Sequence, residues 1–187
     1  MKNQIKNILL VMMIIGFQNN YVQASEEFMK AIESKDFAKV NSLIASGIDV
    51  NVEDETVVSP LMLAIEMQNY DMVDALIKAG ADVNNNVPVL YIAISAIEDD
   101  VESGKNIIKR LITAHADLND INIFGETPLS NAIISKNMDI VQILVEAGAD
   151  IHAEDKDGDT PLDIANRYGT RSIARYLMSK GAIALHY

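Results

Sequence analysis

Apolar and polar residues follow a helical pattern that returns several times along the chain. In residues 72–77 and 140–145, apolar residues occupy positions i, i+1, i+3, i+4 and i+5. This spacing places the apolar side chains on one stripe of a helix. Gly80 and Gly148 follow these runs, where a left-handed glycine commonly ends a helix. We therefore predict a short amphipathic helix at each run.

A second motif precedes these helices in fixed register. Ser/Thr-Pro-Leu-x-x-Ala begins at Ser59, Thr127 and Thr160. The hydroxyl can cap a helix, and proline suits the first helical position because the N–H it lacks would have no partner there. Gly169, or a polar pair such as residues 136–137, ends the helix after about two turns. The predicted unit is a helix, a tight turn, a second helix and an extended loop.

The unit recurs with a period near 33 residues. The phrase Gly-Ala-Asp-Val-Asn and its variants begin at residues 47, 80, 115, 148 and 181, which are steps of 33, 35, 33 and 33. A fixed period of this size indicates one supersecondary unit that is copied and stacked. It favours an extended binding surface over a catalytic pocket.

Taken together, the two motifs closely resemble the pattern of the ankyrin-repeat family, over about residues 26–187. The resemblance implies an all-α fold, an ankyrin-repeat solenoid of about five helix-turn-helix units with projecting β-turn fingers. It also implies binding through the fingertips and the first helices. The units are expected at residues 26–54, 55–86, 87–120, 121–154 and 155–187.

The chain departs from this pattern in its first and third units. The first unit lacks the Thr-Pro-Leu entry, and residues 88–93 replace it in the third. The spacing predicts a finger between units two and three that is about four residues short. It also predicts an insertion of about six residues near 97–104. We expect the insertion to be a solvated acidic turn, with a loose cation site as the alternative, and its acidic residues are Glu98, Asp99, Asp100 and Glu102.

The first 24 residues differ in character from the rest. Lys2 and Lys6 precede an apolar stretch at residues 8–17, and Val22-Gln23-Ala24 offers small residues for cleavage. This pattern predicts a signal peptide at 1–24, a repeat domain at 25–187 and a periplasmic or secreted location. The alternative is an extra amphipathic helix or an uncleaved anchoring helix.

Composition narrows the possible partners. The net charge of −12 argues against nucleic acid and anionic membranes, both of which are polyanions. It favours a partner of basic character, although acidity that serves only solubility explains it equally well. His115 and His152 occupy repeat slots, and the chain has no cysteine. The sequence shows no catalytic or metal-ligand motif, so we expect no enzyme activity, no cofactor and no metal.

Two further features carry alternative interpretations. Arg167, Arg171 and Arg175 form an i, i+4, i+8 row that is either a polar cap or a docking patch. Ile123 and Phe124 lie at a predicted fingertip, where they either anchor a partner or fold back onto the neighbouring finger. Val57 replaces the glycine of other fingers, so its turn should differ in shape.

The predicted function is an exported, monomeric module that binds a protein, as an inhibitor or immunity protein or a stress-protection accessory. The alternatives are a secreted effector that binds host proteins and an accessory domain for a small molecule or metal. The expected partner contacts are the variable, solvent-facing slots Glu55, Thr56, Val58, Glu66, Met67, Ile123, Phe124, Glu126, Ile134, Lys156, Asp157, Asp159, Arg167 and Tyr168.

Overall fold

The computed structural model describes residues 22–52, 58–84, 88–97 and 101–185. Residues 22–33 are helical, and the helices that follow have defined bounds. They are α2 (Phe37–Ala45), α3 (Pro60–Glu66), α4 (Tyr70–Lys78), α5 (Val89–Ser95), α6 (Val101–Thr113), α7 (Pro128–Ile134), α8 (Met138–Ala147), α9 (Pro161–Arg167) and α10 (Arg171–Ser179). The described residues contain no β-strand. The predictions for residues 1–21, Glu55, Thr56, Val57, Glu98, Asp99 and Asp100 lie outside the described residues.

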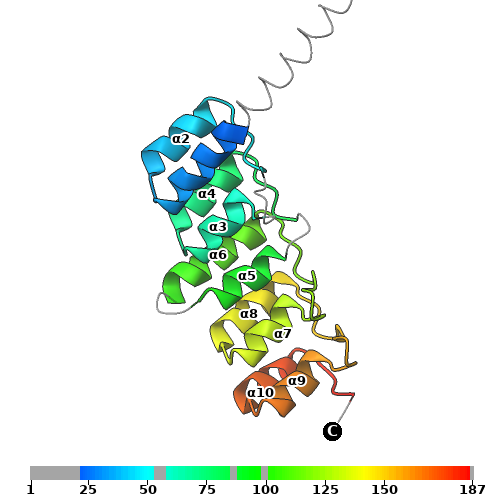
Figure 1. The fold of residues 1–187 in the computed structure, drawn as a ribbon. Helices are drawn as coiled ribbons and strands as arrows, with labels where there is room; N and C mark the ends of the chain where they lie inside the picture. The colour runs from blue at the N-terminus through cyan, green and yellow to red at the C-terminus, as the bar shows by residue number, and fades with distance from the viewer. Residues whose placement is uncertain (1–21, 53–57, 85–87, 98–100, 186–187) are drawn as a thin grey trace, which may run out of the picture.

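The helices pair into units, and the units stack in chain order (Figure 1). The first helices of neighbouring units pack side by side as α3, α5, α7 and α9, and the second helices do so as α4, α6, α8 and α10. The connecting loops project to one side of the stack (Figure 1). The predicted all-α repeat solenoid is confirmed.

Local sequence explains why the first helices α3, α7 and α9 are so short. The hydroxyls of Ser59, Thr127 and Thr160 accept hydrogen bonds from backbone N–H groups three residues ahead, and proline follows each of them. A left-handed residue follows α3 and α7 in the turn to the second helix, with φ of 50° at Gln68 and 56° at Lys136. The asparagine after each of these residues then caps the second helix.

The core runs through the stack as columns of equivalent residues. Leu76, Leu111, Leu144 and Leu177 are fully buried and succeed one another at the repeat interval. A column of alanines, which includes Ala64 and Ala132, lies in the first helices and is also buried. Because alanine is small, it lets the helices of one pair and the next approach closely. Each unit therefore buries its apolar stripe against its neighbours.

Unit three differs from the others in the way its insertion folds. Most of the added length is helical, because α6 has 13 residues where α4 and α10 have 9 each. The expected acidic turn is therefore wrong for residues 101–104, which form the first turn of α6. Gly104 lies against Ile97, and a Cβ at this glycine would lie 2.5 Å from the Ile97 side chain. The added turn is thus packed onto the segment that precedes it.

The finger between units two and three is short, as predicted. Ten residues separate Lys78 from Val89, whereas 14 separate Thr113 from Pro128. In this unit Pro88 lies at the N-cap rather than at the first helical position, and no side chain caps the helix. A full-length finger and a hydroxyl cap are therefore both missing at α5.

Candidate protein-binding surface

Asparagine side chains connect the bases of neighbouring fingers. Asn84 Nδ2 donates to the His115 carbonyl (2.9 Å), and the Asp117 N–H donates to Asn84 Oδ1 (2.8 Å). Asn51 makes the same pair of bonds to Gly80 and Asp82. Each amide thus satisfies a donor and an acceptor of the next unit. These bonds hold successive fingers in register.

His115 and His152 have structural positions, as their repeat slots predict. His115 replaces the glycine that ends the second helix, and its φ is 65°, in the left-handed region. His152 occupies the asparagine slot, and its N–H donates to Asp150 Oδ1 (2.8 Å). Within the described residues, neither imidazole makes a hydrogen bond to a candidate catalytic partner.

The tip of the fourth unit's finger is organised by Asn122. Its Oδ1 accepts from the N–H groups of Phe124 and Glu126, both at 2.9 Å. Gly125 follows at φ 77°, a conformation that most side chains disfavour. Asp155 makes the equivalent bonds in the next finger. Both tips are therefore ordered turns fixed by their own polar side chains.

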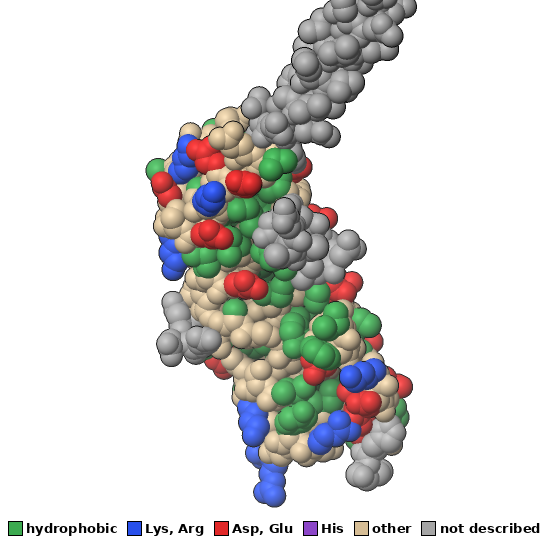
Figure 2. All heavy atoms as spheres, viewed as in Figure 1, with side chains coloured by type: hydrophobic (Ala, Val, Ile, Leu, Met, Phe, Trp, Pro, Cys, Tyr) green, Lys and Arg blue, Asp and Glu red, His purple; other side chains and the backbone are tan. Residues whose placement is uncertain are grey.

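The side chains at this tip face solvent. Ile123 is 93% exposed and Phe124 is 54% exposed, and Ile121 beside them is also exposed. The Lys156 ammonium lies 5.9 Å from the centroid of the Phe124 ring, so the neighbouring finger covers one side of that ring. Ile123 does not fold back onto a neighbour. Figure 2 shows hydrophobic side chains gathered on the finger side of the lower half of the stack, beside charged groups of both signs.

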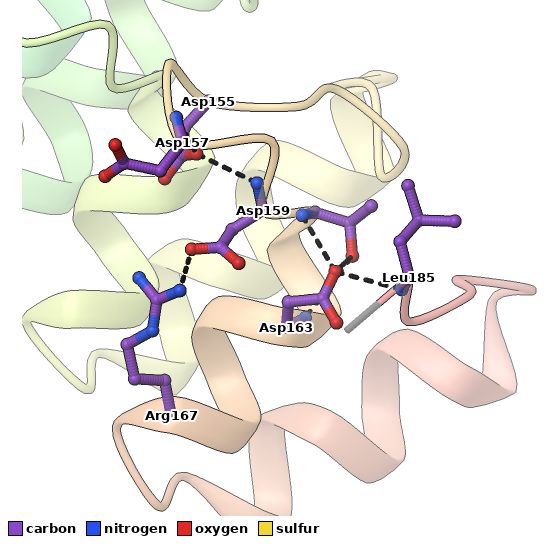
Figure 3. A network of polar contacts seen from close by, with 7 residues as sticks. Asp155, Asp157, Asp159, Asp163, Arg167 and Leu185 are labelled. Carbon is purple, nitrogen blue, oxygen red and sulfur yellow. Dashed lines mark hydrogen bonds and ion pairs between the residues drawn. The ribbon is translucent and has the colours of Figure 1, made fainter. Parts of the chain in front are cut away.

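Asp159 does not occupy a solvent-facing slot, contrary to the expectation from sequence. It is 3% exposed, and its carboxylate forms an ion pair with Arg167 of α9 (Figure 3). The N–H of Asp159 donates to Asp155 Oδ1 (2.9 Å). The cause is the finger turn, which directs this residue toward the helix instead of outward. Asp159 therefore positions Arg167 and is not itself available to a partner.

The segment after α10 closes the same network. Asp163 forms a capping box with Thr160, and its Oδ2 also accepts from the Leu185 N–H (3.0 Å; Figure 3). Thr160 Oγ1 donates to the Ile183 carbonyl (3.0 Å). The last described residues are thus hydrogen-bonded to the start of α9.

The first helices carry the predicted contact residues that do not lie in the fingers. Glu66 and Tyr168 are exposed there, and Met67 and Ile134 are half-buried. Asn131 of α7 donates to Ser95 Oγ of α5 (2.9 Å), and it is buried. Sequence reasoning missed Asn131, because it occupies a slot that is apolar in units two, three and five (Leu63, Ile92 and Ile164). Its bond ties two neighbouring first helices together.

On the side of the stack formed by the second helices, ion pairs connect neighbouring units. Asp74 of α4 binds Lys78 and also Arg110 of α6, each at 2.7 Å. Hydrogen bonds from Lys78 and Arg110 hold the pKa of Asp74 below its ordinary value. Lys105 of α6 pairs with Asp139 of α8, and this hydrogen bond raises the pKa of Lys105. These pairs join units two, three and four on the side away from the tips.

Nine of the fourteen predicted contact residues belong to units four and five, and one of these nine, Asp159, is buried. The exposed ones are Ile123, Phe124, Lys156, Asp157, Arg167, Tyr168 and, farther along the stack, Glu66. Val58, Met67, Glu126 and Ile134 are partly buried. The predicted row of arginines is split, because Arg167 lies on α9 and pairs with the finger, whereas Arg171 and Arg175 lie on α10.

A family model described as "Ankyrin repeats (3 copies)" matches residues 28–103 and 96–185. The chain belongs to the ankyrin-repeat family. Ankyrin repeats are in general protein-protein interaction modules and are typically non-catalytic. No curated protein matches the chain.

The described part of this ankyrin-repeat chain shows neither a membrane-spanning helix nor a cluster of metal-binding side chains. None of its helices is long and apolar enough to cross a membrane. Its His, Asp and Glu side chains form no group of three or more that could hold a metal ion.

Proposed function

We propose that the chain is an exported ankyrin-repeat module that binds a protein through the fingers and first helices of units four and five. The observation that carries the proposal is the exposed Ile123–Phe124 pair on a turn that Asn122 fixes. An ordered tip loses little conformational entropy on docking, so its apolar contacts contribute more fully to affinity. Aromatic anchors of this kind dominate many protein interfaces.

The surroundings of the pair suggest how a partner is oriented. Lys156 lies over the Phe124 ring, and Arg167 is held in place by Asp159. Asp157, next to Lys156 in the same finger, is exposed and contributes charge of the opposite sign. Mixed charges around an apolar centre match the usual pattern of a polar rim around an interface core.

We propose the periplasm or the cell exterior as the location, because residues 1–24 have the pattern of a signal peptide. The partner would then be an exported or envelope protein, with this chain acting as its inhibitor, immunity protein or stress-protection accessory. Mass spectrometry of the exported protein should find a mature amino terminus at Ser25. A retained Met1 in a cytosolic fraction would overturn this location.

The binding site is tested with a photo-crosslinking amino acid at position 123 and, as a matched control, at Val101. Both residues are exposed, but Val101 lies on α6, on the other side of the stack. We expect a crosslinked partner from periplasmic extract at position 123 and none at position 101. Equal crosslinking at both positions would contradict the assigned surface.

The affinity of the captured partner then tests the anchor. Phe124→Ala should weaken binding by about 2 kcal/mol, or roughly 30-fold in Kd, with little change in melting temperature. Val101→Ala removes a comparably exposed apolar side chain and should leave affinity unchanged. If Phe124→Ala lowers the melting temperature but spares affinity, the tip has a structural role and the proposal fails.

A further inference from the structure

The last 24 residues of the chain are positively charged, whereas the rest of the chain is strongly negative. Asp163 is the last acidic residue, and residues 164–187 contain four cations, Arg167, Arg171, Arg175 and Lys180. The whole chain has 27 acidic residues and a net charge of −12. In Figure 2, Lys and Arg side chains lie over the lower end of the stack, where Figure 1 places α9 and α10. This end therefore attracts groups that the rest of the molecule repels.

The outer face of this helix pair is hollowed. An open hollow of about 670 Å³ lies between the end of α9 and α10, and it is lined by Asn166, Gly169, Arg171, Ala174, Arg175 and Met178. Ala174 is buried in its floor, while Met178 is 53% exposed. The hollow thus combines an apolar strip with two guanidinium groups.

Ion pairing distinguishes these two arginines from the others. Arg110 and Arg167 are paired with Asp74 and Asp159. Among the described residues, Arg171 and Arg175 have no acidic partner, and Arg175 Nε donates only to the Arg171 carbonyl (3.4 Å). Both guanidinium groups therefore keep donors free for a ligand outside the chain.

The need for a polar outer face on the last unit does not by itself explain why two unpaired arginines lie there. Any polar residues satisfy the need for a soluble outer face on a terminal repeat, and acidic ones serve solubility especially well. Arginine is the side chain whose planar donors match a carboxylate in two parallel hydrogen bonds. Two arginines one helical turn apart, beside exposed Met178, thus fit a ligand that carries both carboxylates and apolar groups.

We propose that the outer face of α9 and α10 docks an acidic, amphipathic helical segment of a partner protein. Carboxylates one turn apart on that segment would bind Arg171 and Arg175, while its apolar side chains cover Ala174 and Met178. Nucleic acid fits less well, because its long phosphate chain would meet the acidic remainder of the molecule. The hollow borders Arg167 and Tyr168 of the fingertip surface, but it is lined by other residues, and this proposal does not depend on the function proposed there.

The test uses the full ¹⁵N-labelled chain and a synthetic peptide of Glu-Glu-Leu-Leu repeats, with a Lys-Lys-Leu-Leu peptide as the control ligand. We expect the acidic peptide to shift the amide signals of α9 and α10 and to bind more weakly as salt rises. Arg171→Glu/Arg175→Glu should weaken binding about tenfold or more. Lys30→Glu/Lys109→Glu makes the same change in net charge at exposed sites elsewhere and should alter affinity less than about twofold.

Other outcomes overturn the proposal. These are no binding of the acidic peptide at about 1 mM, signal shifts confined to the fingers, or equal losses in both double variants. Self-association that Arg171→Glu/Arg175→Glu abolishes would identify the face as a contact between copies instead. Melting temperatures of both variants are measured alongside, and both should stay close to that of the parent because all four residues are exposed.

Discussion

The asparagine bridge between units two and three provides a measurable test of how the stack is held together. Asn84 is exposed, so Asn84→Ala removes no buried apolar surface. It does remove the bonds to the His115 carbonyl (2.9 Å) and from the Asp117 N–H (2.8 Å). The backbone bond from Asn84 to Asp82 Oδ1 does not involve the Asn84 side chain and should persist. The substitution therefore isolates two hydrogen bonds between units.

The expected cost follows from the exposure of those bonds. A hydrogen bond contributes about 0.5–1.5 kcal/mol net, and exposed groups lie toward the lower end because water replaces the lost partner. Two bonds therefore give about 1–2 kcal/mol, or a fall in melting temperature of about 2–8 °C for a chain of this length. Urea unfolding followed by circular dichroism measures the free energy of unfolding directly.

His152→Ala is the matched control. His152 occupies the same slot in unit four, and its N–H likewise bonds Asp150 Oδ1 (2.8 Å). Within the described residues, its side chain makes no bond to the next unit. We expect a change within about 0.5 kcal/mol. If both substitutions cost the same, the slot acts through local turn preference, and the bridge does not hold the units in register.

Two further predictions concern the core and the charged side of the stack. Leu144→Ala removes a fully buried side chain and should cost roughly 2–5 kcal/mol in the free energy of unfolding; an unchanged urea midpoint would mean that α8 packs differently. Since the folded pKa of Asp74 is lowered, its stabilising effect is present above the ordinary carboxyl pKa and is lost as pH falls through the folded value. Asp74→Asn should therefore be less stable than the parent near pH 7, with a gap that narrows as pH falls below the ordinary carboxyl pKa; a gap independent of pH would show that the charge of Asp74 is not responsible.

Much of the fold was predictable because its signals are local. The hydroxyl caps, the prolines and the glycine slots act within a few residues of chain, and the structure confirms them at Ser59, Thr127 and Thr160. The left-handed conformation of His115 also followed from its position in the repeat. The prediction of an acidic turn was wrong at residues 101–104, because acidic composition suggested a turn, while packing of Ile97 onto Gly104 allows another helical turn.

The candidate surface was harder to predict, because it depends on direction as well as position. Asp159 and Asp157 lie two residues apart in one finger, yet the turn buries the first and exposes the second. Sequence periodicity gives the slot but not the direction of its side chain. The asparagine bridges were missed for a related reason, although the recurrence of Asn51, Asn84 and Asn119 at one slot of the repeat was a usable signal.

Because helix-helix contacts join only adjacent repeat units, they also determine which parts of the molecule can unfold locally. Every substantial helix-helix contact in the described chain lies within one unit or between adjacent units. The last pair, α9 and α10, can therefore detach and return without disturbing α3 and α4. Amide hydrogen exchange should be graded, fastest at the two ends of the stack and slowest in its middle units. How long a binding surface on the last unit stays folded thus depends on the contacts between units four and five, and not on unfolding of the whole chain.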